Sequence, residues 1–171
     1  MGQIGQILAA SGQLVVGYGE QLLQGVTPDN YARYAGGIPS NHPAFIMGHL
    51  ALYPVRVFEH LGADAEPHRP TSAEEKLFEP GVDCRDDPDG TIYPALDVLR
   101  EQFLTRYRDV VQLLADAPDD ALLSENPRPG AARERFPTAA SMWGFYVGGH
   151  AMMHLGQWSA WRRAQGLGPC N

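Results

Sequence analysis

The stretch SMWGFYVGGHAMMHLGQWSAW, residues 141–161, contains no Asp, Glu, Lys or Arg. Its large side chains recur every three or four residues, which is the spacing of one face of an α-helix. This face is predicted to point into the protein core, and it consists of Trp143, Val147, His150, His154, Trp158 and Trp161. Two imidazoles four residues apart on one helix face lie close enough to bind a single metal ion. Two core histidines that only hydrogen-bond to neighbours would show the same spacing.

A third histidine, His49, lies in the equally apolar stretch FIMGHLALY, residues 45–53. No charged neighbour at helical spacing explains an imidazole there. Three neutral imidazoles leave a divalent ion with an open coordination position, which is typical of catalytic metal sites. The sequence therefore predicts one divalent ion at His49, His150 and His154, with zinc or nickel favoured by the nitrogen ligands. The alternative is three histidines packed in the core without metal.

Other histidines and short motifs are less suited to this site. His42 is about two helical turns from His49, roughly 10 Å, which is too far for one coordination sphere. His60 is predicted at a solvated helix end and His68 in a loop. Ala151 occupies the position of the glutamate in an HExxH motif, so a zincin protease is not supported. The partners expected to orient the ligand imidazoles are Glu20, Asn41, Tyr53 and Gln157.

Hydrophobic spacing predicts four long helices over residues 3–24, 41–62, 94–117 and 138–165. Asn41 is the expected N-cap of the second helix, and Pro54 should kink it because proline removes a backbone donor. Residues 63–92 and 124–137 are rich in Pro, Gly and charged residues and are predicted to be long loops. The expected fold is an all-α four-helix bundle with long crossover connections, formed by a single domain over residues 1–171.

Composition excludes several kinds of partner. The chain has 171 residues and a formal charge of −7, with no basic stripe for nucleic acid. It has no run of eighteen apolar residues to cross a membrane, and its first residues lack the basic start of a signal peptide. Cys84 and Cys170 are too few for a disulfide framework, which favours a cytoplasmic location. The acidic neighbours of Cys84 should raise the pKa of its thiol, which argues against a reactive cysteine.

Two motifs resemble those of the DinB/YfiT-like metal-binding four-helix bundles. They are NHPAFIMGHLA, residues 41–51, and HAMMHLGQWSAWRRAQGLGP, residues 150–169. The resemblance extends to YPALDVL at the start of the third helix, whereas Phe45 stands where many members have Trp. It implies the same ligands, His49, His150 and His154, a bundle with long crossovers, and frequent homodimers.

The resemblance also frames the functional hypotheses. Members of this group include transferases of low-molecular-weight thiols and metal-dependent hydrolases, and both would act on a small-molecule substrate. A metal that lowers the pKa of a bound thiol or water suits either reaction. Catalytic residues other than the metal ligands are not predicted. The alternative is a non-catalytic, stress-linked bundle that binds a metal or ligand. A homodimer is expected to form through helix faces, with Trp158 and Trp161 supplying aromatic surface.

Overall fold

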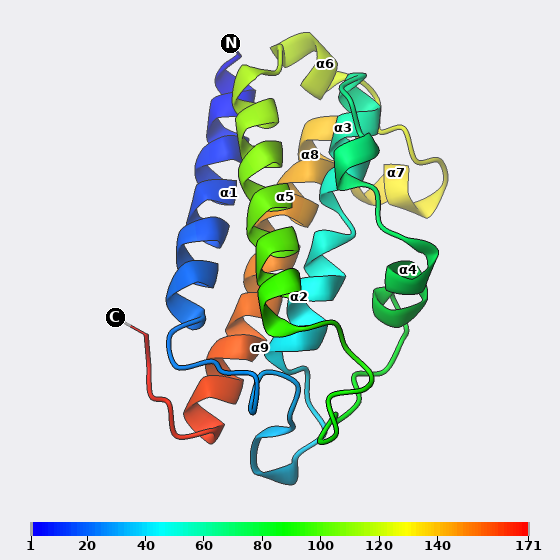
Figure 1. Ribbon diagram of the computed structural model, residues 1–171. Helices are drawn as coiled ribbons and strands as arrows, with labels where there is room; N and C mark the ends of the chain where they lie inside the picture. The colour runs from blue at the N-terminus through cyan, green and yellow to red at the C-terminus, as the bar shows by residue number, and fades with distance from the viewer. Residues whose placement is uncertain (1, 171) are drawn as a thin grey trace.

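The computed structural model describes residues 2–170, and four long helical segments lie along one axis (Figure 1). They are α1 (Gln3–Leu22), α2 (Pro43–Ala51) followed by α3 (Pro54–Leu61), α5 (Leu96–Asp116), and α8 (Ala139–Trp143), the π-helical segment η3 (Gly144–Gly149) and α9 (His150–Ala164). Short helices occupy the connections: η1 (Ala35–Gly37), η2 (Glu66–His68), α4 (Ser72–Phe78), α6 (Asp119–Leu123) and α7 (Ala131–Arg135). No described residue lies in a strand, so the predicted all-α class is confirmed.

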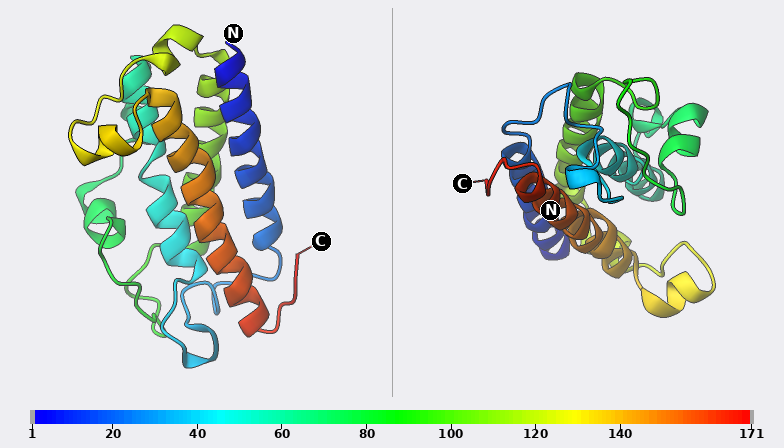
Figure 2. Two further views of the ribbon diagram at one scale, coloured as in Figure 1. Left: turned by 180° about the vertical axis from the view of Figure 1, so that it is seen from behind. Right: turned by 90° about the horizontal axis from the view of Figure 1, so that it is seen from below.

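The long connections follow from the order of the helices in space. The α2–α3 segment and α5 run in the same direction, whereas α1 and the α8–α9 segment run the opposite way (Figure 2). Because α3 ends at the far end of the bundle, residues 62–95 return along its length before α5 begins (Figure 1). Residues 117–138 then cross the end of the bundle to reach α8. The predicted crossovers are therefore confirmed.

The second predicted helix is interrupted at the expected proline. Helix α2 ends at Ala51 and α3 begins at Pro54, since proline is tolerated in the first turn of a helix but not in its interior. The predicted N-cap is wrong, because Nδ1 of His42 accepts the backbone N–H of Phe45 at 3.3 Å. The side chain of Asn41 instead donates a hydrogen bond to Gln157 in the last helix, α9.

The region predicted as a loop over residues 63–92 contains α4, which begins with a capping box. The Thr71 hydroxyl accepts the Glu74 N–H at 3.2 Å, and the Glu74 carboxylate accepts the Thr71 N–H at 2.6 Å. Phe78 at the end of α4 is almost completely buried and lies against Gly48 of α2. This contact covers the outer side of α2, all of whose residues are buried.

The last helix is less regular than predicted and its tryptophans lie inside the bundle. Thr138 caps α8, and the π-helical segment η3 interrupts the helix that was predicted to be continuous over residues 138–165. Trp158 and Trp161 are 0% and 2% exposed, so neither supplies surface for a dimer. The homodimer stays a prediction, and it requires other apolar side chains, such as the exposed Ile7 and Leu14 of α1.

None of the described helices combines the length and apolarity needed to cross a membrane.

Helix α1 contacts the backbone of α5 closely at a glycine. A Cβ atom at Gly5 would lie 2.2 Å from the backbone oxygen of Leu114, which cannot rotate away. Gly17, on the same helix, has no heavy atom within 4 Å of its Cβ position. These two glycines of α1 therefore have different roles, because packing requires Gly5 and does not require Gly17.

We predict opposite effects for two alanine substitutions in α1. Gly5→Ala should lower the free energy of unfolding by about 1–3 kcal/mol, because α1 must move away from α5. Gly17→Ala should raise it by roughly 0.5–1 kcal/mol, because alanine restricts the unfolded chain and favours the helix. Urea unfolding of both variants measures the difference. Equal effects would contradict the described packing of α1 on α5.

Candidate metal centre

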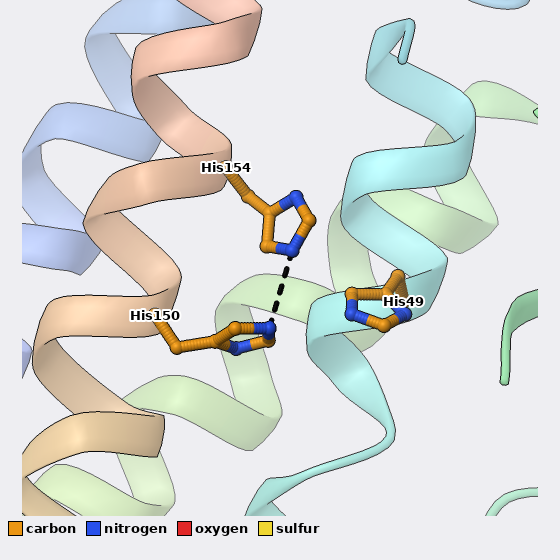
Figure 3. Close-up of side chains that lie close together, drawn as sticks. All are labelled: His49, His150 and His154. Atoms are coloured by element: carbon orange, nitrogen blue, oxygen red, sulfur yellow. Dashed lines mark hydrogen bonds between the residues drawn. The ribbon is translucent and has the colours of Figure 1, made fainter. Parts of the chain in front are cut away.

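Three histidines from two segments of the bundle meet between α2 and α9. His49 lies on α2, and His150 and His154 lie one turn apart on α9, with their rings directed toward one another (Figure 3). One ligand nitrogen from each ring can be chosen such that all three atoms lie within 4.8 Å of one another. The ring centroid of His49 lies 5.4 Å from that of His150 and 4.8 Å from that of His154. The three residues predicted from the sequence are therefore brought together.

His49 is held by the backbone of α4. Its Nδ1 lies 2.7 Å from the carbonyl oxygen of Phe78, which can only accept, so Nδ1 carries the proton and donates. The Nε2 atom of the neutral ring therefore carries a lone pair and no proton. The Phe78 ring lies against Gly48, where a Cβ atom would be 2.3 Å from the ring. Gly48 thus allows the close contact between α2 and the end of α4.

His154 is oriented in the same way by side chains. Its Nδ1 lies 3.0 Å from Oε1 of Gln157, and the same oxygen accepts a hydrogen bond from Nδ2 of Asn41 at 3.0 Å. Because Oε1 is an acceptor, Nδ1 of His154 is the donor and Nε2 carries a lone pair and no proton. Gln157 and Asn41 were among the predicted orienting residues. Glu20, which was also among them, instead forms an ion pair with Arg108.

His150 completes the cluster from within a group of aromatic rings. Its Nε2 lies 3.2 Å from Nε2 of His154 (Figure 3). Because Nε2 of His154 carries the lone pair, the Nε2–H group of His150 donates the hydrogen bond. Its Nδ1 is buried and has no hydrogen-bond partner among the described residues. The rings of Tyr53 and Tyr146 approach it edge to face, at centroid distances of 4.8 and 5.7 Å.

This donor set fits a divalent ion. The lone pairs of His49 and His154 already face the centre, and His150 joins them once its proton moves from Nε2 to Nδ1. Neutral imidazole nitrogen is a common ligand of zinc and nickel. Two of the three rings have an oxygen acceptor on their other nitrogen, as histidine ligands in metal sites generally do. The cluster is therefore consistent with a three-histidine metal site.

Electrostatics keep the three rings neutral. Burial is the main cause that lowers the pKa of His150, to about 4, and the neighbouring His154 and His49 lower it further. Burial and His49 lower the pKa of His154, and burial lowers the pKa of His49. Neutral rings have the protonation state that metal binding requires.

A polar network fixes α4 over the site. Arg106 of α5 is buried, and it donates a hydrogen bond to the backbone oxygen of Ala51 at 3.1 Å while lying 3.9 Å from the Glu74 carboxylate. Gln102 also donates to Glu74, at 2.6 Å. Phe78 and these anchoring residues were not predicted. The capping-box pattern Thr71-x-x-Glu74 is the sequence signal that indicates α4.

Other residues considered from the sequence lie outside the cluster. Nε2 of His42 lies 2.8 Å from the Arg85 carbonyl oxygen, and the ring is fully buried as a helix cap. His68 packs on the Phe58 ring at a centroid distance of 4.1 Å, inside η2 rather than in an open loop. The pKa of Cys84 is raised to about 11, as predicted in direction, although burial contributes more than its acidic neighbours.

One side of the cluster remains accessible along α9. Exposed, uncharged residues follow one another at helical spacing beside His150 and His154, namely Gly149, Met153, Gln157, Ala160 and Ala164. This stripe leads into a hollow of about 490 Å³ that begins at the hydrogen-bonded pair Asn41 and Gln157. The hollow has no charged residue in its lining, which also includes Ala35, Ile38, Ser40 and Trp161. Helix α4 thus closes the His49 side, and the α9 side stays open.

The fold and the cluster define a class of helical proteins with three converging histidines between two antiparallel segments. A comparison with protein families matches residues 19–158 to the DinB superfamily, so the chain belongs to this superfamily. The matched range includes all three histidines, as the sequence resemblance implied. Searches of curated proteins and of solved structures found no match.

We predict that Gln157 raises the affinity of the cluster for metal by orienting the His154 ring. Gln157→Ala should weaken zinc binding by about 10–100-fold, because Nδ1 of His154 loses its acceptor. Gln165→Ala, near the end of the same helix, should leave the affinity unchanged. Competition with a chromophoric chelator measures both. Equal affinity in the two variants would show that Gln157 does not support a ligand.

A second prediction concerns acid sensitivity of the metal-free protein. Because the folded-state pKa of His150 lies below the ordinary 6.5, its neutral form stabilises the fold fully above pH 6.5. That contribution is lost as the pH falls from 6.5 toward 4. His150→Leu, which cannot titrate, should lose less stability over this interval than the unmodified protein. Urea unfolding at several pH values in the presence of a chelator measures the difference, and parallel curves would contradict the assignment.

Proposed function

We propose that His49, His150 and His154 bind one divalent ion, zinc or nickel, through their Nε2 atoms. The observation that supports this most directly is the pair of oxygen acceptors on the opposite nitrogens. The Phe78 carbonyl and the Gln157 amide oxygen direct two Nε2 lone pairs into the space that the third ring faces. A core histidine without a metal needs only a hydrogen-bond partner. Hydrogen bonding alone therefore does not require three histidine rings to converge on one point.

We further propose that the site is catalytic and transfers a low-molecular-weight thiol to a small electrophilic substrate. A divalent ion at the site would lower the pKa of a bound thiol and supply a nucleophile near neutral pH. Three protein ligands leave room for that thiol. The uncharged hollow beside Gln157 suits the apolar body of an organic electrophile and lies next to the accessible side of the cluster. A hydrolase would use the same centre with water in place of the thiol.

A non-catalytic metal-binding role is the second candidate. The lining of the 490 Å³ hollow reaches Gln157 but includes none of the three histidines. A substrate held there must therefore extend past Gln157 along α9 to reach the metal. A protein that only binds a metal or ligand would not need that path.

Two free thiols, Cys84 and Cys170, favour a cytoplasmic location for either role.

We expect metal to stabilise the protein only when the cluster is intact. Zinc or nickel at 100 times its dissociation constant should stabilise the fold by about 2.7 kcal/mol, and a chelator should remove this gain. His150→Ala should abolish most of the metal-dependent difference, whereas His60→Ala should retain it. Thermal unfolding with and without metal, together with metal analysis of the purified protein, tests this. An identical response of both variants would refute the metal site.

Catalysis is tested on the metal-loaded protein. Glutathione, cysteine and other small thiols are each offered with monochlorobimane as the electrophile, and a nitrophenyl ester tests hydrolysis. We expect thiol transfer that is lost in His150→Ala and retained in His60→Ala. A protein that binds one equivalent of metal but accelerates neither reaction, with any thiol, would favour the non-catalytic role.

A further inference from the structure

The residue of interest is Tyr53, which lies at the break between α2 and α3. Its position follows from Pro54, because α2 ends just before the proline and Tyr53 becomes the N-terminal flank of α3. The side chain is 5% exposed and its ring stacks on Tyr146 at a centroid distance of 5.0 Å. It meets His49 and His150 edge to face, at 5.2 and 4.8 Å. Tyr53 therefore forms one wall of the histidine cluster.

The hydroxyl of Tyr53 contacts the atom that would bind the metal. It lies 3.2 Å from Nε2 of His49. Because Nδ1 of His49 donates to Phe78, Nε2 holds a lone pair, and the Tyr53 hydroxyl is the donor. An ion bound to Nε2 would take this lone pair and leave the hydroxyl without its acceptor. A buried hydroxyl without a partner is destabilising, so a replacement acceptor is favoured.

The surroundings of Tyr53 favour a negatively charged acceptor. The guanidinium carbon of Arg56 lies 5.6 Å from the centre of the Tyr53 ring. Within the described part of the chain, Arg56 forms no ion pair with a carboxylate. In a protein of net charge −7, the positive charge of Arg56 beside the Tyr53 ring favours an anion there.

We propose that Tyr53 donates a hydrogen bond to the anionic atom that occupies the open coordination position of the metal. This inference rests on the proposed metal site and adds the class of ligand that the site selects. The hydroxyl changes its acceptor from His49 Nε2 in the metal-free protein to the anion in the loaded protein. A thiolate is such an anion, and a hydrogen bond from Tyr53 would hold its sulfur atom in place for transfer to the electrophile.

Cobalt(II) and azide test this directly, because cobalt can replace zinc at such sites and its visible spectrum reports a change of ligand. The variant is Tyr53→Phe, which keeps the ring and removes only the hydroxyl. The matched control is Tyr146→Phe, which removes the hydroxyl of the stacked partner. Each protein is titrated first with cobalt and then with azide. Imidazole serves as a second ligand, since its coordinated nitrogen has no lone pair left to accept a hydrogen bond.

We expect Tyr53→Phe to bind cobalt within a few-fold of the unmodified protein and azide about 10-fold more weakly, as the loss of a charged hydrogen bond implies. Imidazole affinity should not change, and Tyr146→Phe should match the unmodified protein throughout. Unchanged azide affinity in Tyr53→Phe would overturn the inference. A large loss of cobalt affinity in that variant would also overturn it, because Tyr53 would then be a direct ligand.

The outcome for the unmodified protein separates this inference from the proposed function. Failure to bind one equivalent of cobalt, or equal cobalt binding by His150→Ala, would remove the metal site and the inference with it. Normal cobalt binding with an azide affinity that does not depend on Tyr53 would remove the inference alone. Near-ultraviolet circular dichroism of Tyr53→Phe checks that the aromatic packing with Tyr146 and His150 is retained.

Discussion

The contact between Phe78 and α2 is the constraint on which the candidate site depends. The Phe78 ring fits only because residue 48 is glycine, and its backbone carbonyl then meets Nδ1 of His49. Phe78 thus covers the outer side of a helix that is buried all round, and it also sets the tautomer of His49. Removing α4 would expose α2 to water and free the His49 ring. The crossover connection is therefore part of the site as well as a link between helices.

Anchoring this connection requires buried polar groups. Arg106 links α5 to the end of α2 and to Glu74, and Glu74 also closes the capping box that begins α4. A buried guanidinium is costly unless it is paired and hydrogen-bonded, and Arg106 meets both conditions. The network holds α4 at a defined height along the bundle. The Phe78 carbonyl consequently lies level with His49.

The three imidazoles are neutral in the folded protein, and this neutrality affects both the stability of the fold and the chemistry of the candidate site. Burial and mutual repulsion oppose protonation, so the folded state favours rings that have lone pairs. Neutral rings also have the protonation state that binding a cation requires. Tyr53 belongs to this arrangement because its hydroxyl satisfies the one inward lone pair that no histidine proton reaches.

The amino-acid sequence alone determined the four long helical segments, their approximate ends and the three converging histidines. Apolar periodicity indicates which face of a helix is buried, and His49, His150 and His154 were all on such faces. Tertiary structure alone decided what holds them. Phe78 acts through a backbone carbonyl, which every residue has and no pattern marks, and the partner of Asn41 lies 116 positions away. Trp158 and Trp161 were misjudged for the same reason, since periodicity identifies a buried face but not whether the chain itself or a second copy covers it.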